Sequence, residues 1–254
     1  MKKSNKWLRS PIVTVVAFVV AAVLLLGAGI GTTRAALDYR SQVYSTQIGL
    51  DDIDVELLED GTSTSTLLTS LKEYESGESV DKVTLGTAYE EKLSVRNPKA
   101  SDNSINEYVR VTIHKYWTDN SNKDRKLSPK LIELKLGEAD LFDDTILNYG
   151  NWIKDKSSTT DERVVLYYNK LLNAGDPTDL FADNITINKA VMKGAKQTTT
   201  GNKIVTEYAY DGMRFNLEVE VDGVQEHNAS DAVISAWGNE RVSISGTSLS
   251  VDNS

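Results

Sequence analysis

The chain lacks several residue types on which common protein chemistries depend. It contains no cysteine and only two histidines in 254 residues. Disulfides, thiol nucleophiles and thiolate metal sites are therefore excluded. His114 and His227 are far apart in the sequence, and neither a His-Glu-x-x-His zinc helix nor a Ser-His-Asp triad can be assigned from them. Because Gly-x-Ser-x-Gly and nucleotide-binding motifs are also missing, we expect no enzymatic activity.

Only one long apolar run is present, and it lies at the N-terminus. Four basic residues among the first nine precede an almost wholly apolar stretch from Ile12 to Gly31. This order is typical of an export signal, and Thr33 and Ala35 place small side chains where a signal peptidase needs them, before Ala36. Residues 1–35 are therefore predicted to be a signal peptide. The same run could cross about 30 Å of hydrocarbon, so an uncleaved membrane anchor is the alternative.

Removal of residues 1–35 would leave a strongly acidic chain. These residues carry five of the 28 basic residues and none of the 37 acidic ones, so residues 36–254 have a formal charge of −14, from 23 basic and 37 acidic side chains. A polyanion is repelled by nucleic acid and by anionic lipid. We therefore expect a secreted or cell-surface, extracellular protein that has no nucleic-acid partner and meets the membrane only through its N-terminal segment.

The dominant pattern after Ala36 is an alternation of apolar and polar residues. Met213 to Asp222 alternates most cleanly, and Tyr108 to Trp117 alternates likewise, with His114 on the polar side. This period of two is typical of strands with one buried and one solvated face. Further strands are predicted at Val43–Ile48, Ile53–Leu58, Tyr89–Arg96, Leu131–Leu136, Arg163–Asn169, Asn184–Asn188, Lys203–Tyr210 and Arg241–Ile244. The chain is therefore predicted to be mainly β, with residues 36–254 forming one antiparallel β-sandwich domain.

Helix is predicted in one or two short segments only. Asn228 to Gly238 is the better candidate, because Ser230 can cap its start and Gly238 can close its end. Leu67 to Tyr74 is the weaker one. Polar, turn-rich breaks in the strand pattern are predicted at Gly61–Thr66, Pro98–Asn106, Asp119–Lys126, Lys156–Asp161 and Lys196–Asn202.

Three short motifs occur in the order found in one family of exported proteins. They are Gly29 to Leu37, the strand–loop–strand pattern from Leu93 to Val111 that includes the tetrapeptide YVRV, and Leu172 to Phe181. Together they resemble TasA and camelysin-type proteins of Gram-positive bacteria, whose signals are cut by a SipW-type peptidase. Arg34 departs from the aromatic residue usual before the cleaved alanine. The resemblance implies a jelly-roll-like β-sandwich and, for TasA, biofilm-matrix fibres in which one subunit's N-terminal strand completes the next.

The first segment after the predicted cleavage site can supply such a strand. Within residues 39–58 the apolar positions are Val43, Ile48, Leu50, Ile53, Val55 and Leu57. An extended segment of this kind can add to an exposed sheet edge of a neighbouring molecule. It can equally form the first strands of its own domain.

Three classes of function follow. The first is an exported structural protein of the cell surface or extracellular matrix, with a fibre-forming subunit as its specific form, which associates with itself or with other surface proteins. The second is a monomeric, adhesin-like module that binds a glycan or a protein through loops such as Pro98–Asn106. The third, a camelysin-like hydrolase, is disfavoured because no zinc triad is present.

No cofactor is predicted, and calcium is the one metal ion for which the sequence offers suitable ligands. Acidic clusters at Asp51–Asp54, Asp119–Asp124 and Asp140–Asp144 supply hard oxygen atoms, but none has the spacing of the twelve-residue calcium loop. We interpret them as solvated turns. The larger aromatic residues allow a sugar-binding surface or a sandwich core, and we expect core positions for them. These residues are Trp117, Trp152, Tyr167, Tyr168, Tyr208 and Tyr210.

Overall fold

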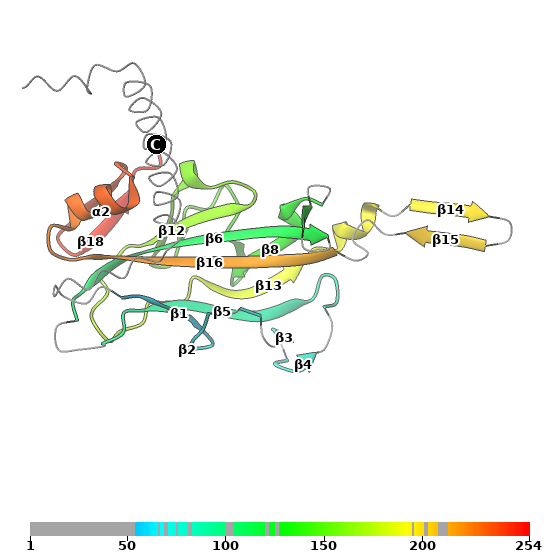
Figure 1. Ribbon diagram of the computed structural model, residues 1–254, viewed down its shortest axis with the longest axis horizontal. Coiled ribbons are helices and arrows are strands. Elements are labelled where there is room, and N and C mark those ends of the chain that lie inside the picture. The colour runs from blue at the N-terminus through cyan, green and yellow to red at the C-terminus, as the bar shows by residue number, and fades with distance from the viewer. Residues whose placement is uncertain are drawn as a thin grey trace, which may run out of the picture. The chain divides into compact units, whose positions relative to one another are not determined.

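The computed structural model describes residues 54–254 except 66, 69–70, 75, 81–82, 100–103, 120–121, 125–126, 195, 201–202 and 208–212. Its strands form two six-stranded antiparallel sheets and three two-stranded hairpins (Figure 1). The predicted signal peptide, its predicted cleavage site and the predicted strand at Val43–Ile48 lie outside the described residues. Among the helices within them, none is both long enough and apolar enough to cross a membrane.

The first sheet has the strand order β2-β1-β5-β13-β8-β9. Its central strands β5, β13 and β8 correspond to three predicted strands, with boundaries that differ by one or two residues. The bounds are β1 Glu56–Glu59, β2 Thr62–Ser63, β5 Ala88–Arg96, β8 Ile132–Leu136, β9 Ala139–Asp140 and β13 Ala182–Ile187.

The second sheet has the strand order β10-β11-β12-β6-β16, with β7 also paired to β6. The two 13-residue strands β6 and β16 pair antiparallel along their whole length, from Met213 opposite Asp119 to Gln225 opposite Glu107, and they lie side by side in Figure 1. The bounds are β6 Glu107–Asp119, β7 Asn122–Asp124, β10 Asn148–Tyr149, β11 Trp152–Lys154, β12 Arg163–Tyr168 and β16 Met213–Gln225.

The main core lies between the inner faces of the two sheets. Val111 and Ile113 of β6 and Leu93 and Val95 of β5 are each 0% exposed and belong to this core. Alternation places these residues on the inner faces and Arg110, Thr112 and His114 on the outer face of β6. The arrangement confirms a mainly β, antiparallel protein and is consistent with the predicted sandwich. Trp117, Trp152, Tyr167 and Tyr168 are buried as expected, whereas Tyr208 and Tyr210 lie outside the described residues.

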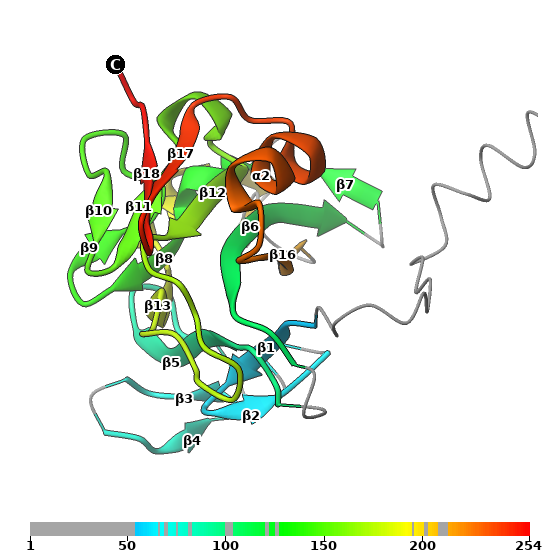
Figure 2. The same ribbon diagram turned by 90° about the vertical axis from the view of Figure 1, so that its left-hand side faces the viewer.

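A second, smaller core covers part of the outer face of the second sheet. Helix α2 (Ala229–Trp237) and the hairpin of β17 (Val242–Ser245) and β18 (Ser248–Val251) pack there. Val233 of α2 and Leu249 of β18 meet Tyr108, Val165 and Tyr167 of the sheet in this second core. Figure 2 shows α2 above β6 and β18 beside β12.

The remaining elements are short. A hairpin of β14 and β15 extends beyond the ends of β6 and β16 in Figure 1 and pairs with no third strand among the described residues. The bounds of these elements are β3 Leu71–Lys72, β4 Ser79–Val80, η2 Pro129–Leu131, η3 Lys156–Ser158, η4 Lys189–Gly194, β14 Lys196–Thr200 and β15 Lys203–Glu207.

Three kinds of local prediction are wrong: one helix, one helix cap and three of the breaks between strands. The helix expected at Leu67–Tyr74 is replaced by β3, because Leu68 has a φ of 57°, in the left-handed region that a right-handed helix does not contain. Helix α2 starts at Ala229, so Ser230 lies inside it and Asn228 occupies the N-cap position without a side-chain cap bond. The predicted breaks at Gly61–Thr66, Asp119–Lys126 and Lys196–Asn202 contain the strands β2, β7 and β14. The predicted stop is confirmed, since Gly238 has a φ of 62° and its N–H donates to the Ile234 carbonyl.

Candidate functional site

Strand β16 forms a long edge of the second sheet, and its inner apolar row is only half covered. Met213, Phe215, Leu217, Val219 and Val221 face the main core but remain partly exposed. Four of their five partners on β6 are buried, including Ile113 directly opposite Val219. An edge strand has a partner on one side only, and no described strand pairs with the other side of β16. The result is a 13-residue row of backbone donors and acceptors beside an incompletely covered apolar surface.

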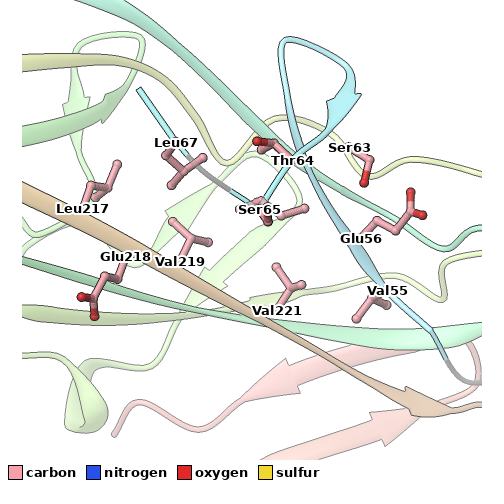
Figure 3. Close-up of a pocket in the computed structure, with 11 residues that line it drawn as sticks. Val55, Glu56, Ser63, Thr64, Ser65, Leu67, Leu217, Glu218, Val219 and Val221 are labelled. Carbon is pink, nitrogen blue, oxygen red and sulfur yellow. The ribbon is translucent and has the colours of Figure 1, made fainter. Parts of the chain in front are cut away.

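A groove runs between β16 and the β1–β2 region of the first sheet (Figure 3). Its volume is about 630 Å³. Leu217, Val219 and Val221 form one wall, and Val55 and Leu67 contribute to the other (Figure 3). The groove therefore combines apolar side chains at alternate positions with an open strand edge, the two features that an added β-strand recognises.

The inner face of β16 is also open toward its N-terminal end. A pocket of about 540 Å³ is lined there by Met213 and Phe215 together with Trp117 of β6 and Val191 of η4. Phe215 packs edge-on against Trp117, with ring centroids 6.4 Å apart. Apolar surface is thus available near both ends of the strand.

A buried carboxyl group, Glu107, marks the place where the N-terminal segment joins the fold. Glu107 is 0% exposed, and its Oε1 accepts a hydrogen bond from the Asp54 N–H at 3.1 Å. Its Oε2 has no hydrogen-bond partner among the described residues. A Cβ at Gly223 of β16 would overlap this oxygen and lie 3.0 Å from Val55 Cγ1. Burial raises the pKa of Glu107 to about 7, although the Asp54 N–H opposes this shift.

The predicted strand-exchange residues divide into two groups. Val43, Ile48, Leu50 and Ile53 lie outside the described residues. Val55 lines the groove, and Leu57 lies in β1, paired with β5 and 8% exposed in the core of its own chain. Leu57 thus serves as part of a first strand of its own domain, the alternative left open by the sequence.

The predicted chemical candidates do not assemble into a reactive site among the described residues. His114 lies on the outer face of β6 and His227 just before α2, next to Glu226. Among the described residues no group of three histidine, aspartate or glutamate side chains is arranged to hold a metal ion. Asp140 and Asp143 accept hydrogen bonds from the N–H groups of Phe142 and Thr145 within their own turns. The interpretation of these acidic clusters as solvated turns without a cofactor stays a prediction.

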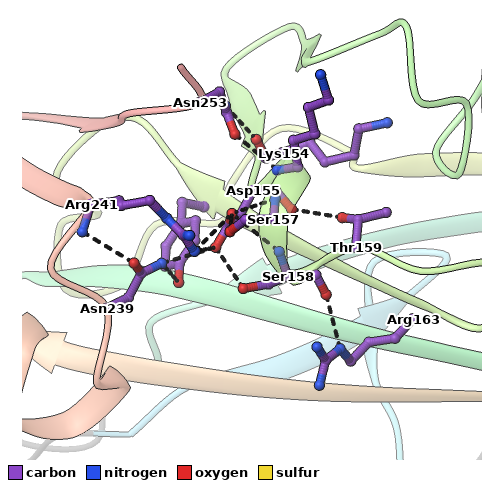
Figure 4. A network of polar contacts seen from close by, with 11 residues as sticks. Lys154, Asp155, Ser157, Ser158, Thr159, Arg163, Asn239, Arg241 and Asn253 are labelled. Atoms are coloured by element: carbon purple, nitrogen blue, oxygen red, sulfur yellow. Dashed lines mark hydrogen bonds and ion pairs between the residues drawn. The ribbon is translucent and has the colours of Figure 1, made fainter.

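A polar network around Asp155 fastens the C-terminal region to the second sheet (Figure 4). The Asp155 side chain is fully buried, and it accepts bonds from Asn239 Nδ2 at 2.9 Å and Arg241 Nη2 at 3.0 Å. Burial disfavours its charge, but the hydroxyls of Ser158 and Ser157 and the Arg241 guanidinium outweigh burial and lower the pKa of Asp155. Sequence patterns missed this network, because its members come from segments about 85 positions apart.

Comparison with known proteins adds no further constraint on the site. No family model, no curated protein and no solved structure matches this chain. The resemblance to TasA and camelysin-type proteins therefore rests on the three sequence motifs alone.

Proposed function

We propose that this protein is an exported structural protein of the cell surface or extracellular matrix, whose subunits associate by strand addition. The N-terminal segment of one copy, residues 36–53, would pair with the open edge of β16 in the next copy. One observation carries this function: β16 offers a 13-residue edge with no described strand partner, beside a half-covered apolar row and a groove of about 630 Å³.

The position of the undescribed segment favours it as the occupant. Residues 36–53 are followed by Asp54 and then by Val55, which already lines the groove. Val43, Ile48, Leu50 and Ile53 would supply the apolar side chains. At about 3.3 Å per residue, an extended segment of this length exceeds the 13-residue β16. A strand added to β16 would cover Leu217, Val219 and Val221 and bond the free backbone groups.

Export and a jelly-roll-like topology belong to the same proposal. The basic and apolar order of residues 1–31, followed by Thr33, Ala35 and Ala36, supports export and cleavage. The antiparallel sheets agree with the fold that the TasA-type resemblance implies. Cleavage before Ala36 would release the segment that strand addition requires, whereas an uncleaved anchor would tether it.

The groove and the segment can be tested separately in the full chain, recovered from outside an expressing cell. We expect filaments or oligomers that grow with concentration, visible by light scattering and electron microscopy. Val219→Lys places a charge in the groove, and Ile48→Asp with Leu50→Asp places charge on the incoming strand. Each variant should stay monomeric at concentrations where the unmodified protein assembles.

A matched control separates groove effects from a general effect of charge. Asn216→Lys adds the same charge to the outer face of β16 and should assemble normally. A synthetic peptide of residues 36–53 should bind the Ile48→Asp, Leu50→Asp protein but not the Val219→Lys protein. If the unmodified protein remains monomeric at all concentrations, strand addition between copies is wrong, and protection of residues 36–53 in that monomer would assign the groove to its own segment.

A further inference from the structure

A polar hollow lies on the outer face of the second sheet, on the opposite side of β16 from the groove. Its volume is about 370 Å³, within the range of roughly 300–1,000 Å³ typical of small-molecule sites. Thr112 of β6, Arg163 of β12 and Glu220 of β16 contribute to its floor. Trp237 and Asn239, at the end of α2, form part of its wall. Three adjacent strands and a helix end therefore converge on one small cavity.

The hollow is built on fixed side chains. Asn239, in its wall, donates to the buried Asp155 carboxylate at 2.9 Å (Figure 4). Arg163 Nε donates to the Ser158 carbonyl at 2.9 Å. The two terminal nitrogens of the guanidinium can therefore donate to a ligand. Arg110 is held on Asp222 by bonds of 3.0 and 2.7 Å from Nε and Nη2. Side chains positioned in advance lose less conformational freedom when a ligand binds.

The charges of the hollow balance. Arg110 and Arg241 are paired with Asp222 and Asp155. The remaining charged groups are the exposed Arg163 and Glu220, of opposite sign, and neither forms an ion pair with a described residue. A cation or an anion would therefore meet a like charge as well as an opposite one. A neutral ligand whose groups both donate and accept hydrogen bonds fits better, because guanidinium only donates and carboxylate only accepts.

An aromatic wall completes the hollow. Trp237 is partly exposed, and Tyr167 supports it with ring centroids 5.3 Å apart. The Arg110 guanidinium lies 5.5 Å from the centre of the Trp237 ring. An indole with an apolar body and one N–H donor suits a ligand that has both C–H surface and hydroxyls. We propose that this hollow binds one uncharged sugar residue of a glycan, with hydroxyls held by Arg163, Glu220, Thr112 and Asn239 and the ring against Trp237.

Sugar binding can be measured by tryptophan fluorescence, because Trp237 borders the hollow and Trp117 and Trp152 are 4% and 0% exposed. The fourth tryptophan, Trp7, belongs to the predicted signal peptide. The full chain would be titrated with methyl α-D-glucopyranoside, methyl β-D-galactopyranoside and N-acetyl-D-glucosamine up to about 50 mM, a range suited to weak sites. At least one probe should give a saturable change that Trp237→Phe abolishes. D-Glucuronate and D-glucosamine, which carry a charge, should bind more weakly.

Matched variants test the assigned contacts. Arg163→Ala and Glu220→Gln alter exposed side chains, so the fold should tolerate both changes. Each should weaken binding by about fivefold or more, the effect of losing a typical hydrogen bond. Arg214→Ala, an exposed arginine of β16 that does not line the hollow, should bind as the unmodified protein does. The proposal is overturned if no uncharged probe saturates, if a charged probe binds more tightly, or if Arg163→Ala and Glu220→Gln leave the affinity unchanged.

Discussion

The two long sides of the sandwich differ in how completely their buried groups are satisfied. On one side, which we call the closed side, two buried lysines donate hydrogen bonds to backbone carbonyls between Ile132 and Asp143. Lys115 Nζ donates to the Ile132 carbonyl at 2.5 Å, and Lys154 Nζ donates to the carbonyls of Leu141 and Asp143. On the open side, beside β1 and β16, Glu91 and Glu107 are each buried with one oxygen that has no partner among the described residues.

The same difference appears in the apolar side chains. Leu141 and Trp152 on the closed side are 0% exposed, whereas Leu217 and Val219 on the open side are partly exposed. Short edge strands end the sheets at the closed side, whereas the long edge strand β16, which pairs only with β6 among the described strands, borders the open side. Among the described residues, the fold is therefore closed at one side and open at the other, where the proposed strand would bind.

The largest expected effect comes from the same substitution on both sides. Leu141→Ala should lower the free energy of unfolding by about 2–5 kcal/mol, because it leaves a cavity in a closed core. Leu217→Ala should cost about 1 kcal/mol or less, because that side chain is already partly solvated. Urea unfolding of both variants, below any assembly concentration, measures the contrast. Equal losses would show that the open side is packed as tightly as the closed side.

Buried carboxyl groups make the open side sensitive to pH. Burial, with smaller contributions from Glu59 and Asp60, raises the pKa of Glu91 to about 8. The folded protein therefore keeps a proton on Glu91 that the unfolded chain loses above about pH 4.5. The free energy of unfolding is highest below that pH and falls as the pH rises to about 8. Relative to Glu91→Gln, the unmodified protein should lose about 4 kcal/mol of stability between pH 4.5 and 8.5.

Urea unfolding at several pH values tests the Glu91 prediction. Glu90→Gln, on the adjacent position of β5 and in an ion pair with Lys92, is the matched control and should follow the pH dependence of the unmodified protein. A stability difference between Glu91→Gln and the unmodified protein that does not change with pH would contradict the assignment of Glu91 as a buried, protonated group.

A smaller effect is expected where Glu107 meets Gly223. Gly223→Ala would bring a methyl group onto Glu107 Oε2 and against Val55, and such overpacking typically costs about 1–3 kcal/mol. Combining it with Glu107→Ala should restore part of that loss, because the overlapping oxygen is removed. A double-mutant cycle in thermal unfolding measures the coupling. Additive losses would mean that the two residues do not compete for the same space.

The smallest effect is expected from the projecting hairpin. Replacing residues 196–207 with a short Gly-Ser connection should change the free energy of unfolding by about 0.5 kcal/mol or less, since β14 and β15 pair only with each other among the described strands. Thermal unfolding of the deletion variant tests this expectation. A large loss would mean that the hairpin contributes to closing the open side.

The alternation of apolar and polar residues predicted most of the long strands. How deeply the apolar side chains of each strand are buried depends on which strands lie beside it in the sheet. The period of two in Met213–Asp222 is the same whether β16 is central or at an edge, so its half-covered row was not visible in the pattern. Lys115 shows the reverse case. It occupies an inward position of β6 and is 0% exposed. Its ammonium group is stabilised there because it donates a hydrogen bond to the Ile132 carbonyl and lies 3.7 Å from the centre of the Phe142 ring.

Features that depend on neighbouring residues could be predicted from the sequence. These are the strand period, the end of α2 at Gly238, and the order of basic, apolar and small residues before Ala36. Only the tertiary structure decided the groove and the hollow. The groove brings Val55 to Val221 and the hollow brings Thr112 to Trp237, pairs that lie more than a hundred positions apart. Contacts of that kind depend on which strands become neighbours in the sheets, and local patterns carry no information about that choice.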